Sequence, residues 1–247
     1  MRHHSIHTLL VALLLSEGVF LSGCGGGSSG SSGVSNIPNT RLLPPAAGQS
    51  WTYSVTGSLQ SGGYSFPITG TYLKAYVAPQ GATGGLLYEE VASVDINEQP
   101  FVDGFITQVH IDPTTGNVQT TGLQENSATA PDPLSAPVLA LPSSFALFYS
   151  SDQNSTQSSS GHPYSHQFKI VGIEKIKVAA GTFKTWRVQE TTIDGTSTTT
   201  EDGWYAPEFG REIKAHTTLT DSTTPNSMTI LNLELSSTTV APPLPLP

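Results

Sequence analysis

The sequence has little charge, a single cysteine and no apolar run long enough to cross a membrane. Only 12% of its 247 residues are charged, and 10 lysines and arginines stand against 19 aspartates and glutamates, so the net charge is −9. An acidic chain without a basic cluster repels phosphate backbones, which argues against nucleic-acid binding. A lone cysteine excludes an internal disulfide, and a β domain of about 190 residues buries enough surface to fold without one. We therefore expect no metal and no cofactor.

Serine, threonine, glycine and proline are abundant instead, with 24 glycines and 18 prolines. This composition favours short strands joined by turns over helices. Apolar residues alternate with polar ones in several segments, as at Trp51, Tyr53 and Val55, and Asp194-Gly195 is a strong hairpin signal. We expect an all-β fold, with a single antiparallel, strongly curved sheet or open barrel of about 9–11 strands.

The composition also divides the chain into parts. We expect a signal peptide (1–23), a flexible Gly/Ser/Pro tether (24–47), an antiparallel β domain (48–237) and a Pro-rich tail (238–247). Within the β domain, 124–163 is rich in Ser, Thr and Pro and shows no sustained period, which predicts an irregular insert. Its short apolar segment, 137–149, could be a lid over a cavity or a cap on the end of the barrel.

The amino terminus has the order of a bacterial lipoprotein signal. Arg2 precedes the apolar run Thr8–Leu15, which is too short to span a bilayer, and Leu21–Cys24 follows with the sequence LSGC. This order resembles the lipobox of bacterial lipoproteins. The resemblance implies cleavage before Cys24, lipidation of its thiol and attachment to a membrane by that anchor. The alternatives are a secreted protein with a stray cysteine and a leader that stays uncleaved in the membrane.

The same resemblance predicts where the protein resides. Lipoproteins lie in the bacterial cell envelope, and those of enteric-type bacteria that stay in the inner membrane often have aspartate after the lipidated cysteine. Gly25 occupies that position in this sequence. We therefore expect a lipid-anchored envelope protein, at the outer rather than the inner membrane.

A second resemblance lies in the β domain. The segments IKVAAGTFKTWRV at 176–188 and WYAPEFG at 204–210, with GQSWTY from Gly48, resemble a family of bacterial envelope lipoproteins of unknown function. Ala179 replaces the usual proline of its signature, and Glu208-Phe209 replaces the usual Gly-Val. The resemblance implies a curved sheet or open barrel loosely related to lipoprotein carriers of the LolA/LolB type, with no known catalytic residues.

No set of residues forms a nucleophile with a base, so we expect no enzyme. Glu201 and Asp202 are neighbours whose side chains would point to opposite faces of a strand, so we interpret the pair as a solvated turn. Asp103 shares a predicted inward face with apolar residues. His162 and His166 are spaced for one face of a helix, but Pro163 opposes a helix there, so we expect no metal site.

Two functions remain. The first is a membrane-anchored β module that binds a hydrophobic or amphiphilic, lipid-like ligand in its concave face, with Trp51, Tyr53, Trp186 and Trp204 as candidate ligand-binding residues. The second is a structural or protein-interaction module of the envelope, with an envelope protein as partner and no small-molecule site. The first requires a hollow interior and the second a packed one.

Overall fold

The computed structural model describes residues 40–78, 86–125 and 131–240, and these parts are all-β. The strands are β1 (Thr40–Arg41), β2 (Ser50–Ser61), β3 (Tyr64–Val77), β4 (Leu86–Ile96), β5 (Gln99–Ile111), β6 (Val118–Glu125), β7 (Asp132–Leu141), β8 (Ser144–Phe145), β9 (Ser150–Thr156), β10 (Pro163–Val178), β11 (Gly181–Asp194), β12 (Ser197–Ala206), β13 (Arg211–Asp221) and β14 (Ser227–Thr238). None of these residues forms a helix that is long and apolar enough to cross a membrane.

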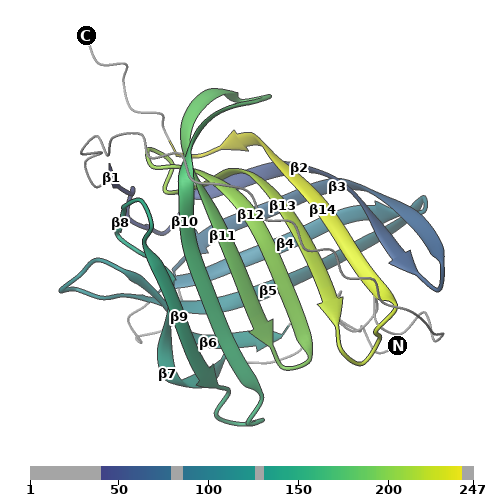
Figure 1. The fold of residues 1–247 in the computed structure, drawn as a ribbon, viewed down its shortest axis with the longest axis horizontal. Coiled ribbons are helices and arrows are strands. Elements are labelled where there is room, and N and C mark those ends of the chain that lie inside the picture. The colour runs from purple at the N-terminus through teal and green to yellow at the C-terminus, as the bar shows by residue number, and fades with distance from the viewer. Residues whose placement is uncertain (1–39, 79–85, 126–130, 241–247) are drawn as a thin grey trace, which may run out of the picture.

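Twelve strands form one antiparallel sheet in the order β7-β6-β5-β4-β3-β2-β14-β13-β12-β11-β10-β9, while β1 pairs with β8. The sheet curls almost into a barrel, so that the wall of β10 to β14 crosses the wall of β2 to β5 (Figure 1). Pairing between β2 and β14 joins the two halves of the chain, as at Val55 and Leu233. The all-β, single-sheet fold predicted from the alternation is confirmed.

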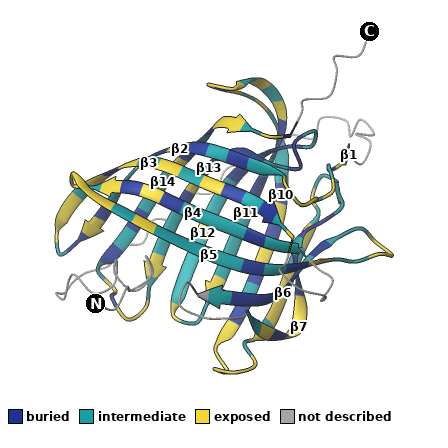
Figure 2. Cartoon of the chain, turned by 180° about the vertical axis from the view of Figure 1, so that it is seen from behind, coloured by how far each residue is buried: buried dark blue, intermediate teal, exposed yellow. Residues whose placement is uncertain are grey.

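Alternation determines which face of each strand is buried. In β2, Trp51, Tyr53 and Val55 are almost fully buried, while the polar residues between them are less buried (Figure 2). In β11, Trp186 and Val188 are both buried on the inner face. The apolar side chains of opposite walls meet inside the curled sheet, because the alternating faces of all the strands point to one interior.

The end of the barrel near β1 and β8 is closed by aromatic packing. Phe145 of β8 is completely buried, and its ring lies 5.5–6.0 Å from the rings of Phe168, Trp186 and Tyr205. These edge-to-face and tilted contacts bring β8, β10, β11 and β12 together. The apolar segment 137–149 therefore supplies a cap at this end, which was one of the two expected roles.

The barrel keeps one seam, between the edge strands β7 and β9. An isolated bridge joins Leu134 to Gln157, and side chains take over much of the remaining pairing. The Ser155 hydroxyl donates to the Ala136 carbonyl at 2.8 Å and accepts from the Ala136 N–H at 3.0 Å, and the Leu139 N–H donates to the Gln153 side chain. The edges are thus held by polar side chains rather than by a full ladder.

The prediction that 124–163 is irregular is wrong, because this segment contains β7, β8 and β9. In β9, polar residues occupy the whole strand (SSDQNST), so it shows no apolar alternation although it pairs fully with β10. An edge strand exposed on both faces needs no such alternation. These added strands also take the sheet above the expected number.

The expected tether, 24–47, is shorter than predicted at its carboxyl end. Leu42 is buried, and the Leu43 N–H donates to the Pro207 carbonyl at 2.9 Å. Gly210 allows this approach, because a β-carbon there would lie only 2.5 Å from the Leu43 carbonyl oxygen. Residues 40–43 are therefore docked on the closed end of the barrel, while the rest of the tether up to residue 39 lies outside the described residues.

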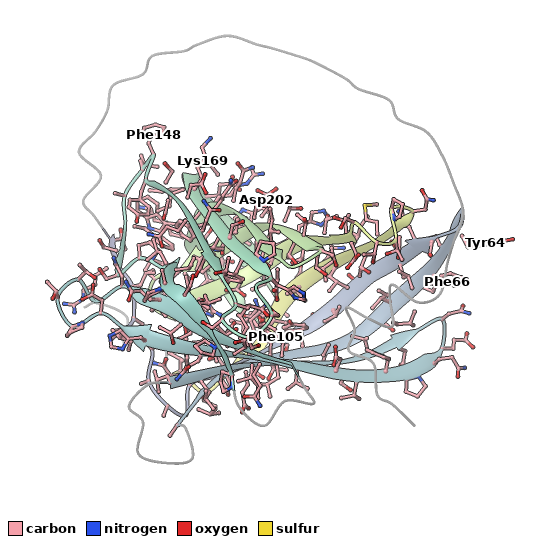
Figure 3. The ribbon with its side chains drawn as sticks, turned by 90° about the horizontal axis from the view of Figure 1, so that it is seen from below. Tyr64, Phe66, Phe105, Phe148, Lys169 and Asp202 are labelled. Atoms are coloured by element: carbon pink, nitrogen blue, oxygen red, sulfur yellow. The ribbon has the colours of Figure 1, made fainter. Side chains whose placement is uncertain are left out.

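Truncation of the cap should strongly destabilise the fold. Phe145→Ala removes a fully buried ring from the closed end, and we expect the free energy of unfolding to fall by about 3–5 kcal/mol. Phe148→Ala is the matched control, because Phe148 is 79% exposed on the neighbouring loop and points away from the barrel (Figure 3). Urea unfolding followed by circular dichroism measures both. Equal effects of the two variants would contradict the proposed role of Phe145.

Candidate functional site: an interior cavity with buried charges

The rest of the barrel interior is hollow. A cavity of about 300 Å³ extends from the aromatic packing towards the end that carries the β4–β5, β11–β12 and β13–β14 turns. Ile96, Asp194 and Thr229 line it close to these turns, and Ile96 and Asp194 are only partly buried, so this end is the mouth. The volume lies at the lower end of the range of small-molecule pockets.

The wall of the cavity is apolar and aromatic near the sheet and polar where long side chains reach inwards. The apolar and aromatic side chains come mostly from β2 to β5 and β14, and include Val55, Ile68, Tyr72, Tyr76, Tyr88, Val94, Phe105 and Leu231. Besides Tyr72, Tyr76 and Tyr88, the titratable side chains are Lys74, Glu90, Asp103, Tyr164, His166, Glu190, Asp194, Glu201, Tyr205 and Arg211. A wall of this kind can bury an apolar group and bind a polar one.

An ion pair between Lys74 of β3 and Glu212 of β13 lies at the inner end of the cavity. The Lys74 ammonium contacts the Glu212 carboxylate directly and lies 3.5 Å from Glu90, and both members of the pair are buried. Burial alone would lower the pKa of Lys74, but the carboxylates of Glu212, Glu201 and Glu90 outweigh it and raise the pKa. Burial would raise the pKa of Glu212, but Lys74 and Arg211 lower it. Both groups are therefore charged near neutral pH.

Arg211 is the second buried cation of this end. Its guanidinium carbon lies 4.1 Å from the centre of the Tyr88 ring and 5.8 Å from that of Tyr76, and its Nε lies 3.8 Å from the Glu212 carboxylate. Tyr53 bonds to the neighbouring residue of β13, because its hydroxyl donates to the backbone carbonyl of Glu212 at 2.8 Å. Arg211 is thus stabilised by ring faces as well as by a carboxylate.

A chain of hydrogen bonds runs along the opposite wall. The Tyr205 hydroxyl donates to one oxygen of Glu190 at 2.6 Å, and His166 Nε2 lies 3.0 Å from the other. His166 Nδ1 lies 2.7 Å from the Leu139 carbonyl of β7. Both partners of the imidazole are acceptors, so both bonds form at once only when His166 is protonated. Burial lowers the pKa of His166, but Glu190 and the Leu139 carbonyl outweigh it and raise the pKa.

Glu201 of β12 lies between the Lys74–Glu212 ion pair and the hydrogen-bonded chain that contains Glu190. It pairs across the sheet with Glu190 on one side and with Thr217 on the other, and the Thr217 hydroxyl donates to its carboxylate at 2.9 Å. Burial raises the pKa of Glu201, Lys74 partly offsets this, and the carboxylates of Glu212 and Glu190 raise it further, to about 8. Glu201 therefore carries a proton at neutral pH and can release it in response to a small change in its surroundings.

None of the four predicted ligand-binding candidates lines the cavity. Trp51, Tyr53 and Trp186 are packed in the core at or near the closed end. Trp204 points outwards, where its Nε1–H donates to Glu174 at 2.9 Å and its ring lies 5.6 Å from the Arg187 guanidinium. Tyr205, the next residue of β12, faces the cavity instead, in phase with Glu201.

The structure places the three acidic residues considered in the sequence, Asp103, Glu201 and Asp202, on different faces of the sheet. Asp103 lies on the inner face, as its alternation predicted. Glu201 and Asp202 do point to opposite faces, but they lie within β12 rather than in a turn. Glu201 faces the cavity, while Asp202 lies on the outer side, where it contacts Arg187 at 3.2 Å (Figure 3).

The two predicted histidines are not brought together. His162 is exposed in the turn before β10, whereas His166 faces the cavity beside a carboxylate that the sequence did not place there. Within the described ranges, no group of three or more His, Cys, Asp or Glu side chains could hold a metal ion. Cys24, the predicted lipid attachment site, lies outside the described residues.

Comparisons with known proteins add little. No family model and no curated protein matches the sequence. Among solved structures, a Bacteroides fragilis protein with a YmcC-like fold, thought to be exported, is similar over 80% of this chain and 100% of its own, at 9% identity and a TM-score of 0.36. A likeness at this level supports no conclusion about function.

Removing one partner of the buried ion pair should cost much more than removing an exposed one. Lys74→Met leaves Glu212 buried without its main partner, and we expect the free energy of unfolding to fall by about 3–5 kcal/mol. The control is Lys214→Met, whose pair with Glu234 is partly exposed and should contribute less than about 1 kcal/mol. The double variant Lys74→Met/Glu212→Gln should recover part of the loss. No recovery in chemical denaturation would contradict the pairing.

His166 should make stability depend on pH. Its folded pKa is raised above the unfolded value, so its contribution is complete below the unfolded pKa of about 6.5 and is lost as the pH rises through the folded pKa. The difference in unfolding free energy between wild type and His166→Gln should therefore shrink with rising pH. His216→Gln is the control, because it removes an imidazole that lies on the exposed outer face and bonds to Asn232. Urea titrations from about pH 5.5 to about pH 9 test this.

Proposed function

We propose that this protein is a lipid-anchored protein of the bacterial envelope that binds an amphiphilic ligand inside its barrel. The observation that carries the proposal is the cavity of about 300 Å³, which is closed at one end by aromatic packing and lined by both apolar and titratable side chains. Such a cavity suits a ligand with an apolar part and a polar group, because each finds a matching wall.

The anchor is the second part of the proposal. Its support is the LSGC motif at Leu21–Cys24 behind the short apolar run, with Cys24 as the lipid attachment site. The chain enters the fold at β1, which is docked at the closed end. A tether from this end would leave the mouth of the barrel free to receive a ligand, and Gly25 after the cysteine favours the outer membrane.

The alternative function, a structural or interaction module of the envelope, required a filled interior. The hollow half of the barrel counts against it, because a protein without a ligand gains stability from filling such space. The buried charges count against it as well, since ion pairs inside a protein are seldom more stabilising than apolar packing.

The proposal can be tested by filling the cavity. Ala92 is buried on the inner wall beside Tyr72, and Ala92→Trp should place a ring in the space that the ligand would occupy. Ser93→Trp is the matched control, because Ser93 is the next residue in β4 and is exposed on the outer face. Both variants gain the same side chain, but only the first gains it inside the barrel.

The measurement is binding of an environment-sensitive fluorescent fatty amphiphile, with mass spectrometry of lipids that co-purify with each variant. Ala92→Trp should reduce affinity by roughly tenfold or more, whereas Ser93→Trp should bind as the wild type does. A wild-type protein that binds no amphiphile and purifies empty would refute the proposal. Equal binding by both variants would place the ligand outside the cavity.

A further inference from the structure

The charges on the cavity wall are unequal, and this inequality indicates the chemistry of the ligand. Five carboxyl groups line the cavity, namely Glu90, Asp103, Glu190, Asp194 and Glu201, against the basic groups of Lys74, His166 and Arg211. Glu212 lies directly behind Lys74 and adds a further carboxylate. The interior therefore has more acidic groups than bases to balance them, although carboxylates are costly to bury without cations.

Each basic group of the wall lies beside a carboxylate, although the Arg211 Nε makes no hydrogen bond. Lys74 contacts Glu212 and lies near Glu90, and Arg211 lies against the ring of Tyr88 and near Glu212. His166 is held between Glu190 and the Leu139 carbonyl. An anionic ligand at Lys74 or His166 would have to displace a partner of that group, and at Arg211 it would compete with Glu212, whose carboxylate lies 3.8 Å from the Arg211 Nε.

Glu201 is the carboxyl group in the middle of the wall that lacks such a partner. Among the described residues, no lysine, arginine or histidine nitrogen lies within 4.0 Å of its carboxylate. Its hydrogen bond comes from the neutral hydroxyl of Thr217. The rings of Tyr72 and Tyr205 line the same cavity. The faces of aromatic rings attract organic cations.

We propose that the ligand of this cavity carries a positively charged organic group, such as an ammonium, attached to an apolar part, and that the Glu201 carboxylate receives this group. The inference rests on the proposed function, because it names the class of amphiphile that the same cavity would take. The apolar part would lie along Val94, Phe105 and Leu231, on the apolar side of the wall.

The protonation of Glu201 links binding to pH. Its pKa of about 8 means that the empty cavity holds a proton on this group at neutral pH, and a cationic ligand would take the place of that proton. The titratable groups around Glu201 are Tyr53, Tyr72, Lys74, His166, Glu190, Tyr205 and Glu212, from β2, β3, β10, β11, β12 and β13. Affinity for a permanent cation should therefore rise with pH until Glu201 is ionised.

Three probes of equal chain length separate charge from apolar burial: octyltrimethylammonium, octanol and octanoate. Isothermal titration calorimetry is performed on the full chain carrying Cys24→Ser, which prevents lipid attachment at that residue. Octyltrimethylammonium should bind roughly tenfold or more tightly than octanol, and octanoate more weakly than both. Titrations in two buffers of different ionisation enthalpy should show the release of close to one proton with the ammonium probe at about pH 7, and none with octanol.

The variant Glu201→Gln keeps the size of the side chain and an acceptor for Thr217 but cannot ionise. It should lose the preference for octyltrimethylammonium over octanol and the proton release, while its affinity for octanol stays within about twofold of wild type. Asp202→Asn is the matched control, because Asp202 is the next residue of the same strand and lies on the outer face. This variant should leave both the preference for octyltrimethylammonium and the proton release unchanged.

The outcomes distinguish the two proposals. If octanol and octanoate bind the wild type as tightly as the ammonium probe, the cationic ligand is refuted and the amphiphile-binding function stands. If no probe binds, both fail. An ammonium preference that persists in Glu201→Gln would refute the role of Glu201, and in that case the wild-type protein should also release no proton. The proton measurement needs no variant, so the inference can be tested even if Glu201→Gln does not fold.

Discussion

The buried ion pair between Lys74 and Glu212 depends on the curvature of the sheet, and the cavity is built around it. Lys74 is in β3 and Glu212 in β13, with β2 and β14 between them, so in a flat sheet the two strands would lie about 14 Å apart. Their side chains meet because the sheet curls and both point inwards. The Tyr53 hydroxyl, which donates to the Glu212 carbonyl, spans the same curve. Flattening the sheet would separate Lys74 from Glu212 and leave two buried charges without a partner.

This arrangement divides the interior into two halves with different physics. At the closed end, Phe145 and its ring neighbours pack as a protein core does. Beyond Lys74 and Arg211 the side chains of the facing walls do not fill the barrel, and a cavity remains. The charged groups that form its inner end must be held by partners in a low dielectric, so their positions are strongly constrained. A ligand entering at the mouth would meet a prearranged set of charges and rings.

The alternation in the sequence was a good guide to the fold and a poor guide to the site. It predicted the inner face of β2, where Trp51, Tyr53 and Val55 are buried. Strict alternation would put Glu212 on the face opposite Ile213 and Ala215. The bulge opposite Trp204 and Tyr205 breaks the phase and buries both Glu212 and Ile213. Lys74 could have been found, since it shares a face with Tyr72 and Tyr76.

The sequence by itself determined the strand-rich fold and the inward faces of the regular strands, and it predicts lipid attachment at Cys24, because alternation, turns and motifs are local patterns. Tertiary structure decided which strands form the seam, that Phe145 closes one end, and which charged side chains share the interior. These features depend on contacts between residues far apart in the chain, such as His166 with Leu139 and Lys74 with Glu212. The raised pKa of Glu201 in particular follows from the curl of the sheet, which buries its carboxyl group and places the carboxylates of Glu212 and Glu190 near it.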